Sequence, residues 1–186
     1  ASVFKLVTTA ALFEAGGETL SMEAMLGKGR HSRPDGRTRL SIVYTGFLGD
    51  NENILFWVSQ FLSEAVRFCQ RNPSDALQAN AMFDEADLYI PANSKPATAE
   101  PLQSLLKRAR SAGLGLMLAT QSPGDLDYKS RDQITSWFIG RVREDTALRK
   151  LKAAFQSESG LDPATALPGQ TVGEFHLVQE GLVRPM

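Results

Sequence analysis

Two adjacent carboxylates, Asp84 and Glu85, end the apolar stretch Leu77 to Phe83. The stretch predicts a strand, although Gln78 and Asn80 make it more polar than a buried parallel strand normally is. Successive residues at a strand end point in different directions. One carboxylate could therefore hold a magnesium ion while its neighbour polarises an attacking water, as nucleotide hydrolysis requires. The alternative interpretation is that Asp84 and Glu85 open a solvated loop.

The complementary phosphate-binding motif is missing from the chain. No segment matches G-x-x-x-x-G-K-[ST], the loop whose backbone cradles phosphates and whose lysine and hydroxyl complete a nucleotide site. The 186 residues therefore contain the residue types for half of an ATP site.

Further polar residues follow the next predicted elements. Gln121 directly follows the apolar run Leu114 to Thr120, and the ends of adjacent parallel strands lie together at the edge where ligands bind. Its amide could contact a γ-phosphate or the attacking water, or could simply begin the turn Gln-Ser-Pro-Gly. The cations at the end of the preceding helix form a solvated face or include an arginine that reaches a neighbouring subunit. These cations are Lys107, Arg108 and Arg110, with Arg141 and Arg143 as second candidates for a phosphate or interface contact.

The pattern along the chain predicts an α/β fold. Apolar residues at three- and four-residue spacing predict a helix over 53–70, and Pro101 and Gly113 bracket a second helix over 100–111. Strands are predicted at 40–48, 77–83, 114–120 and 137–142, a helix at 144–155, and a β-hairpin over 170–186. Alternation of strands and helices predicts a mostly parallel sheet covered by helices.

The predicted domains are 1–37, a helical head with a basic, Gly-rich linker, and 38–186, the main body. The head is expected to form two short helices around Gly16 and Gly17. Because the chain begins at Ala1 and not at a methionine, we expect a processed product or an excised part of a longer protein.

The composition of the chain excludes several classes of protein. The formal charge of −1 gives no global cationic field, so any DNA contact must be local or shared among subunits. Cys69 is expected in the core, and His31 and His176 form no metal-binding pattern with it. There is no signal-peptide pattern and no apolar run of about 20 residues, so we expect a cytoplasmic protein without a membrane span.

Three blocks together resemble the HerA and FtsK group of P-loop ATPases, and most closely bacterial HerA-like proteins. They are Met82–Pro91 with its Asp-Glu-Ala core, Leu105–Leu116 with arginines before Gly-x-Gly, and Leu118–Pro123 with Ala-Thr-Gln. The resemblance covers about residues 38–180, and the closing Leu167-Pro-Gly-Gln170 with its hairpin also looks like the C-terminal segment of that group.

The resemblance implies the C-terminal part of a RecA-like motor that assembles as a hexameric ring, binds ATP and Mg²⁺ between subunits, and pumps double-stranded DNA, in some members with a nuclease. By position, Asp84 would be the metal carboxylate of the Walker B motif, Glu85 the catalytic base and Gln121 the sensor. Arg110, or else Arg108, would be the arginine finger. The strand of the absent loop would lie between those predicted at 114–120 and 137–142.

The sequence leaves three functions open. The first is an ATP-driven DNA translocase or helicase, of which this chain alone would be inactive or very weak. The second is a non-catalytic assembly or docking module that keeps the fold. The third is a related conjugation or secretion ATPase.

Overall fold

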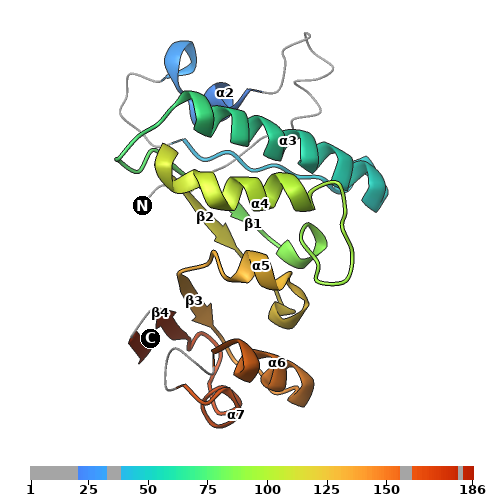
Figure 1. Cartoon of the computed structure of the whole chain (residues 1–186), viewed down its shortest axis with the longest axis vertical. Helices are drawn as coiled ribbons and strands as arrows, with labels where there is room; N and C mark the ends of the chain where they lie inside the picture. The colour runs from blue at the N-terminus through green and yellow to red at the C-terminus, as the bar shows by residue number, and fades with distance from the viewer. Residues whose placement is uncertain (1–20, 33–38, 156–160, 180–181) are drawn as a thin grey trace. The chain divides into compact units, whose positions relative to one another are not determined.

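The computed structural model describes residues 21–32, 39–155, 161–179 and 182–186 (Figure 1). The chain forms two compact units. The first runs to Ile90 and resumes over Ser94–Ala119, and the second comprises Pro91–Asn93 and Thr120–Met186. The boundary predicted after residue 37 adjoins residues outside the described part and stays a prediction, as do the helices predicted before residue 21.

The long helix α3, Asn51–Arg71, confirms the prediction made from apolar spacing. Asp50 caps it by accepting the Asn53 backbone N–H at 2.8 Å, and the helix ends at Arg71, with Asn72 as its C-cap before Pro73. Its inner stripe is buried and includes Cys69, as predicted; the buried apolar residues are Val58, Leu62, Ala65, Phe68 and Cys69. This stripe supplies a large part of the core of the first unit.

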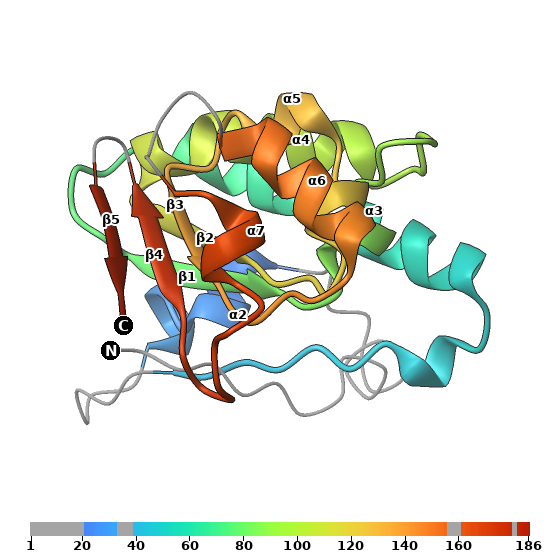
Figure 2. The same cartoon turned by 90° about the horizontal axis from the view of Figure 1, so that it is seen from below.

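The strands that the structure describes in the first unit form one parallel pair. β1, Ala79–Phe83, pairs with β2, Leu114–Leu118, in the register Ala79↔Leu114 to Phe83↔Leu118. The crossover contains α4, Ala99–Arg108, and the 3₁₀ turn η4, Ala109–Ala112. Figures 1 and 2 show α3 and α4 side by side on one face of the pair. The predicted helix over 100–111 and the strands at 77–83 and 114–120 are thus confirmed, with shorter strands.

Gly113 makes the tight return from η4 into β2. Its φ of 59° lies in the left-handed region, and a Cβ there would collide with the carbonyl of Ala76. A glycine satisfies both requirements without strain.

The strand predicted over 40–48 is wrong. After α2, Met22–Leu26, and the 3₁₀ turn η1, Gly29–His31, residues 39–45 belong to no strand, and the 3₁₀ turn η2 covers Gly46–Leu48. The Ser41 hydroxyl donates to the Met25 carbonyl at 2.8 Å, and the Tyr44 side chain is 64% exposed. The segment is therefore held against α2. The side chains whose strand propensity led to the prediction, such as that of Tyr44, face solvent and do not pack on a sheet.

The second unit contains an antiparallel sheet in the order β3–β4–β5. β3 is Ser136–Ile139, β4 is His176–Gln179 and β5 is Leu182–Pro185. The predicted C-terminal hairpin is confirmed, with its turn at 180–181 outside the described residues. The described residues of this unit also form η5, Pro123–Asp125, and the helices α5, Tyr128–Arg131, α6, Asp145–Phe155, and α7, Pro163–Ala166.

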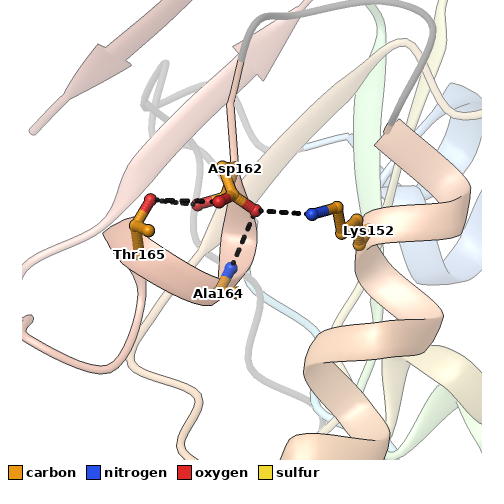
Figure 3. A network of polar contacts seen from close by, with 4 residues as sticks. All are labelled: Lys152, Asp162, Ala164 and Thr165. Carbon is orange, nitrogen blue, oxygen red and sulfur yellow. Dashed lines mark hydrogen bonds and ion pairs between the residues drawn. The ribbon is translucent and has the colours of Figure 1, made fainter.

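Helix α6 packs on this sheet through a small apolar cluster. The buried members are Ile139, Leu148, Leu151, Leu167 and Val178. Asp162 caps α7 by accepting the Ala164 N–H at 3.4 Å, and Lys152 of α6 reaches the same carboxylate at 3.4 Å (Figure 3). Because both charged side chains are almost half exposed, this ion pair aligns α7 with α6 and adds little stability.

The expected α/β class holds, with a small parallel sheet and flanking helices, but the expectation of a mostly parallel sheet is wrong. Among the strands of the described residues, only β1 and β2 are parallel, and β3 pairs with the hairpin instead of with β2. The hairpin supplies β3 with a partner from its own unit.

Candidate functional site

Asp84 and Glu85 lie where β1 ends, as predicted. Both side chains are exposed, and one oxygen of the Asp84 carboxylate accepts the Glu85 backbone N–H at 3.1 Å. The following residue, Ala86, is fully buried, and its N–H donates to the Ala119 carbonyl at 2.9 Å. The acidic pair is thus held against the end of β2.

The backbone of Glu85 is strained. With φ 51° and ψ 49° it is in the left-handed region, where it is the only non-glycine residue among those the structure describes. This conformation costs an ordinary residue about 1–2 kcal/mol. The 3₁₀ turn η3, Ala86–Leu88, holds it in place, since the Leu88 N–H donates to the Glu85 carbonyl at 3.0 Å. Such strain concentrates at functional sites, where the surroundings enforce it.

Tyr89 closes the same turn and was missed by the sequence analysis. Its ring meets the Phe83 ring edge to face at 6.3 Å, and its carbonyl accepts the hydroxyl of the fully buried Thr98 at 2.6 Å. Burial raises the pKa of the Tyr89 phenol, and the nearby Glu85 and Asp84 carboxylates raise it further. The phenol therefore stays a neutral donor beside the acidic pair. Its position four residues after Glu85, one helical turn on, was the available signal.

Gln121 follows β2 by three residues. The Ala119 N–H still donates to the Phe83 carbonyl at 2.9 Å, so the parallel pairing continues to the residue beside Asp84. Gln121 itself is exposed and belongs to the second unit, as does Arg141, which is exposed after β3. Their convergence with Glu85 stays a prediction.

The structure separates Arg108 and Arg110 from the acidic pair of the same chain. α4 runs opposite to the strands, and Gly113, just after η4, accepts the Gln78 N–H at 2.7 Å at the beginning of β1. The five residues of β1 span about 15 Å at 3.3 Å per residue. Both exposed arginines thus lie at the opposite end of the parallel pair from Glu85.

The acidic pair fits magnesium chemistry in part. Mg²⁺ typically takes one or two protein carboxylates, with waters and substrate phosphates as its other ligands. Asp84 offers an exposed carboxylate, and the described residues contain no group of three or more His, Cys, Asp or Glu suited to a metal. The residues that would hold the phosphates are absent, since the sequence lacks a G-x-x-x-x-G-K-[ST] loop.

In the described part of the chain, no helix is both long and apolar enough to cross a membrane.

Comparison with solved structures shows that this chain is similar in fold to a viral genome-packaging NTPase. The chain matches B204 of Sulfolobus turreted icosahedral virus 2, in complex with AMP, at a TM-score of 0.55 and 20% identity, over 80% of this chain and 66% of that one. It matches B204, the DNA-packaging ATPase of Sulfolobus turreted icosahedral virus, at a TM-score of 0.58 and 16% identity, over 99% and 79%.

B204 of Sulfolobus turreted icosahedral virus 2 is also solved with AMPPCP, with ATP-γS and with sulfate. No family model matches this sequence. No curated protein matches it either.

Proposed function

We propose that this chain is the C-terminal part of a RecA-like, ATP-hydrolysing DNA translocase or helicase of the HerA and FtsK type. The observation that supports it most is the strained Glu85 beside Asp84 at the end of a parallel strand, held by the neighbouring strand that leads to Gln121. The fold shared with a DNA-packaging ATPase supports the same class.

Each residue has a distinct role in this proposal. Asp84 holds the magnesium shell, and bound Mg²⁺ neutralises charge on the phosphates. Glu85 polarises the water that attacks the γ-phosphate. Its fixed backbone aims the carboxylate, so no reorganisation is needed at the moment of reaction. Gln121 contacts the γ-phosphate and responds to its loss.

A cation must stabilise the charge that develops on the transferred phosphoryl group. The cations at the end of α4 cannot do so within one chain, because they lie at the other end of the parallel pair from Asp84 and Glu85. Arg110, or else Arg108, supplies it to the site of a neighbouring subunit. An arginine supplied in this way accelerates hydrolysis by about 10³–10⁵. Arg141 and Arg143 contact phosphate or the subunit interface. The assembled protein is a homo-oligomer, a hexameric ring in the full-length form, that acts on double-stranded DNA in the cytoplasm, with a nuclease as a further partner.

Because the phosphate-binding loop is absent, we expect this chain alone to bind ATP weakly and to hydrolyse it very slowly or not at all. Rapid turnover by the purified chain would show that the division of roles is wrong. If the reading frame ahead of Ala1 encodes a G-x-x-x-x-G-K-[ST] loop, the motor gains support. If it encodes none, a non-catalytic docking module becomes the better interpretation.

The decisive measurement uses the product of the whole reading frame. Glu85→Gln should lower kcat for ATP by at least about 10² with little change in KM, because a general base contributes roughly 10²–10⁴. Glu144→Gln, an exposed acid of the second unit, is the matched control and should retain activity. Equal activity of the two variants refutes the role of Glu85. Identification of the cargo that co-purifies, DNA or protein, separates the translocase from a secretion ATPase.

A further inference from the structure

The turn that follows β2 is shaped by contacts within the second unit. We call residues 120–126 the Gln121 turn. The Ser122 N–H donates to the Thr120 hydroxyl at 2.9 Å, and the Asp125 N–H donates to the Ser122 carbonyl at 2.9 Å. Leu126, at the end of the turn, is buried. The exposed Gln121 thus begins a turn whose far end is anchored in the unit.

A segment that lies earlier in the chain closes the turn from outside. Pro91 forms an antiparallel bridge with Leu126, and the Ala92 N–H donates to the Asp125 carbonyl at 2.7 Å. Pro91 and Ala92 belong to the second unit as well. The backbone of Asp125 is therefore hydrogen-bonded through both its N–H and its carbonyl, and its carboxylate can make a third contact.

Lys150 of α6 makes that third contact. Its Nζ lies 2.7 Å from an oxygen of the Asp125 carboxylate, and its aliphatic stem lies on Gly124, where a Cβ would collide with it. The neighbouring Arg149 behaves differently, since its guanidinium donates to the hydroxyl of Thr146 on the same helix at 3.4 Å. Lys150 therefore joins α6 to a segment 25 residues earlier in the chain instead of contacting its own helix.

Helix α6 is a firm support for this contact. Leu148 and Leu151, which flank Lys150 in the sequence, are buried in the cluster that packs α6 on the antiparallel sheet. The Lys150 and Asp125 side chains are 45% and 52% exposed, so their ion pair adds little to stability. Its main consequence is geometric, because it joins the turn to a helix that the core holds in place.

We propose that Lys150 is a positioning residue, which clamps the Gln121 turn to α6 and thereby fixes where the Gln121 amide lies. This inference rests on the proposed function, in which Gln121 contacts the γ-phosphate. A displacement of about 1 Å at such a contact can lower a rate by about 10². A lysine that makes no contact with the nucleotide would thus be needed for rapid hydrolysis.

The first test measures the turn itself, by NMR hydrogen exchange of the purified chain without nucleotide. Lys150→Ala removes both the stem and the ammonium, and it should accelerate exchange of the Asp125 and Ala92 amides at least about fivefold. Lys150→Met keeps the stem and should accelerate exchange about two- to fivefold, the range that an exposed ion pair allows. Gly124→Ala displaces the stem from the other side and should accelerate exchange of the same amides.

Lys152→Ala is the matched control. Lys152 lies on the same helix and is similarly exposed, but it pairs with Asp162 instead of with the turn. This variant should leave the exchange of both amides unchanged. Circular dichroism melts confirm that each variant is folded.

The second test measures ATP hydrolysis by the product of the whole reading frame. Lys150→Ala should lower kcat about tenfold with little change in KM, and Lys150→Arg, which keeps the charge, should retain most of the activity. In a Gln121→Ala background, Lys150→Ala should lower kcat no further, because the residue that it positions is gone. A purely structural role of Lys150 would lower kcat equally in both backgrounds.

Two results would overturn the proposal: unchanged exchange of the Asp125 and Ala92 amides in Lys150→Ala, or an equal loss of kcat with and without Gln121. If Gln121→Ala loses activity while Lys150→Ala keeps it, the positioning role alone is refuted. If Gln121→Ala itself retains full kcat, the function proposed for Gln121 is refuted, and the positioning role falls with it whatever the exchange shows.

Discussion

Replacing Glu85 by glycine should stabilise the first unit more than replacing it by alanine, the reverse of the usual order. Both changes remove the carboxylate and its repulsion with Asp84, so their difference isolates the backbone. Alanine keeps the left-handed cost of about 1–2 kcal/mol that φ 51° imposes. Glycine avoids this cost but loses about 0.5–1 kcal/mol of backbone entropy on folding. The free energy of unfolding of the Glu85→Gly variant should exceed that of the Glu85→Ala variant by about 0.5–1 kcal/mol.

Urea unfolding measures this difference if one unit is observed at a time. The chain has two tryptophans, Trp57 in the first unit and Trp137 in the second, so Trp137→Phe leaves a reporter of the first unit alone. With a slope of about 1–3 kcal/mol/M, the midpoint of the glycine variant should lie about 0.2–1 M above that of the alanine variant.

Gln60, exposed in the middle of α3, provides the matched control. In a regular helix alanine is more stabilising than glycine by about 0.8–1.0 kcal/mol, so the order of the alanine and glycine variants in stability must reverse between the two sites. If alanine is better at both positions, Glu85 is not held in a strained conformation, and the structural argument for its role is lost.

Three further outcomes are expected. In a spectrophotometric titration, the Tyr89 phenol should ionise above its ordinary pKa, and Glu85→Gln should lower that pKa; the loss of the step in Tyr89→Phe identifies it. The stability that this phenol contributes is complete below about pH 10 and falls as pH rises through the folded-state pKa, because the folded state then binds more protons than the unfolded state. An unmoved step in Glu85→Gln contradicts this. Buried Cys69, whose thiol pKa burial raises, should react with a thiol reagent only after unfolding, and immediate labelling in buffer refutes its burial. Gly115→Ala should lower the urea midpoint because its Cβ would collide with the Asn80 amide, and Asn80→Ala should restore it; additive effects in the double variant would count against the clash.

The sequence predicted the elements in which the spacing of apolar residues matches the positions that become buried. The apolar spacing over 53–70 located α3 to within two residues, and Gly113 marked the end of the crossover. The strand predicted from Leu77 begins only at Ala79. Leu77 is apolar, but its side chain is 68% exposed and does not belong to the core. For the same reason β-branched and aromatic residues misled at 40–48, where α2 holds the chain by polar contacts.

The candidate site was predictable in composition but not in conformation. Asp84 and Glu85 were located by type and position. The left-handed Glu85 is held between η3 and the hydrogen bond from Ala86 to Ala119, and the latter joins residues 33 positions apart, which no local pattern encodes. Tyr89 acquires its place beside the carboxylates only through that turn.

The last strand determines where the sheet of the second unit can grow. Phe175 and Met186 exchange both backbone hydrogen bonds, at 3.2 and 2.8 Å, so alternate residues of β5 bond towards β4 and direct the groups of Val183 and Pro185 outwards. Proline has no N–H to offer, and Arg184 adds a charge to this border. A strand approaching β5 would find a single backbone donor there. Among the described strands of this sheet, β3 has the border with a full set of donors, so a strand from another part of the protein would extend the sheet beside β3.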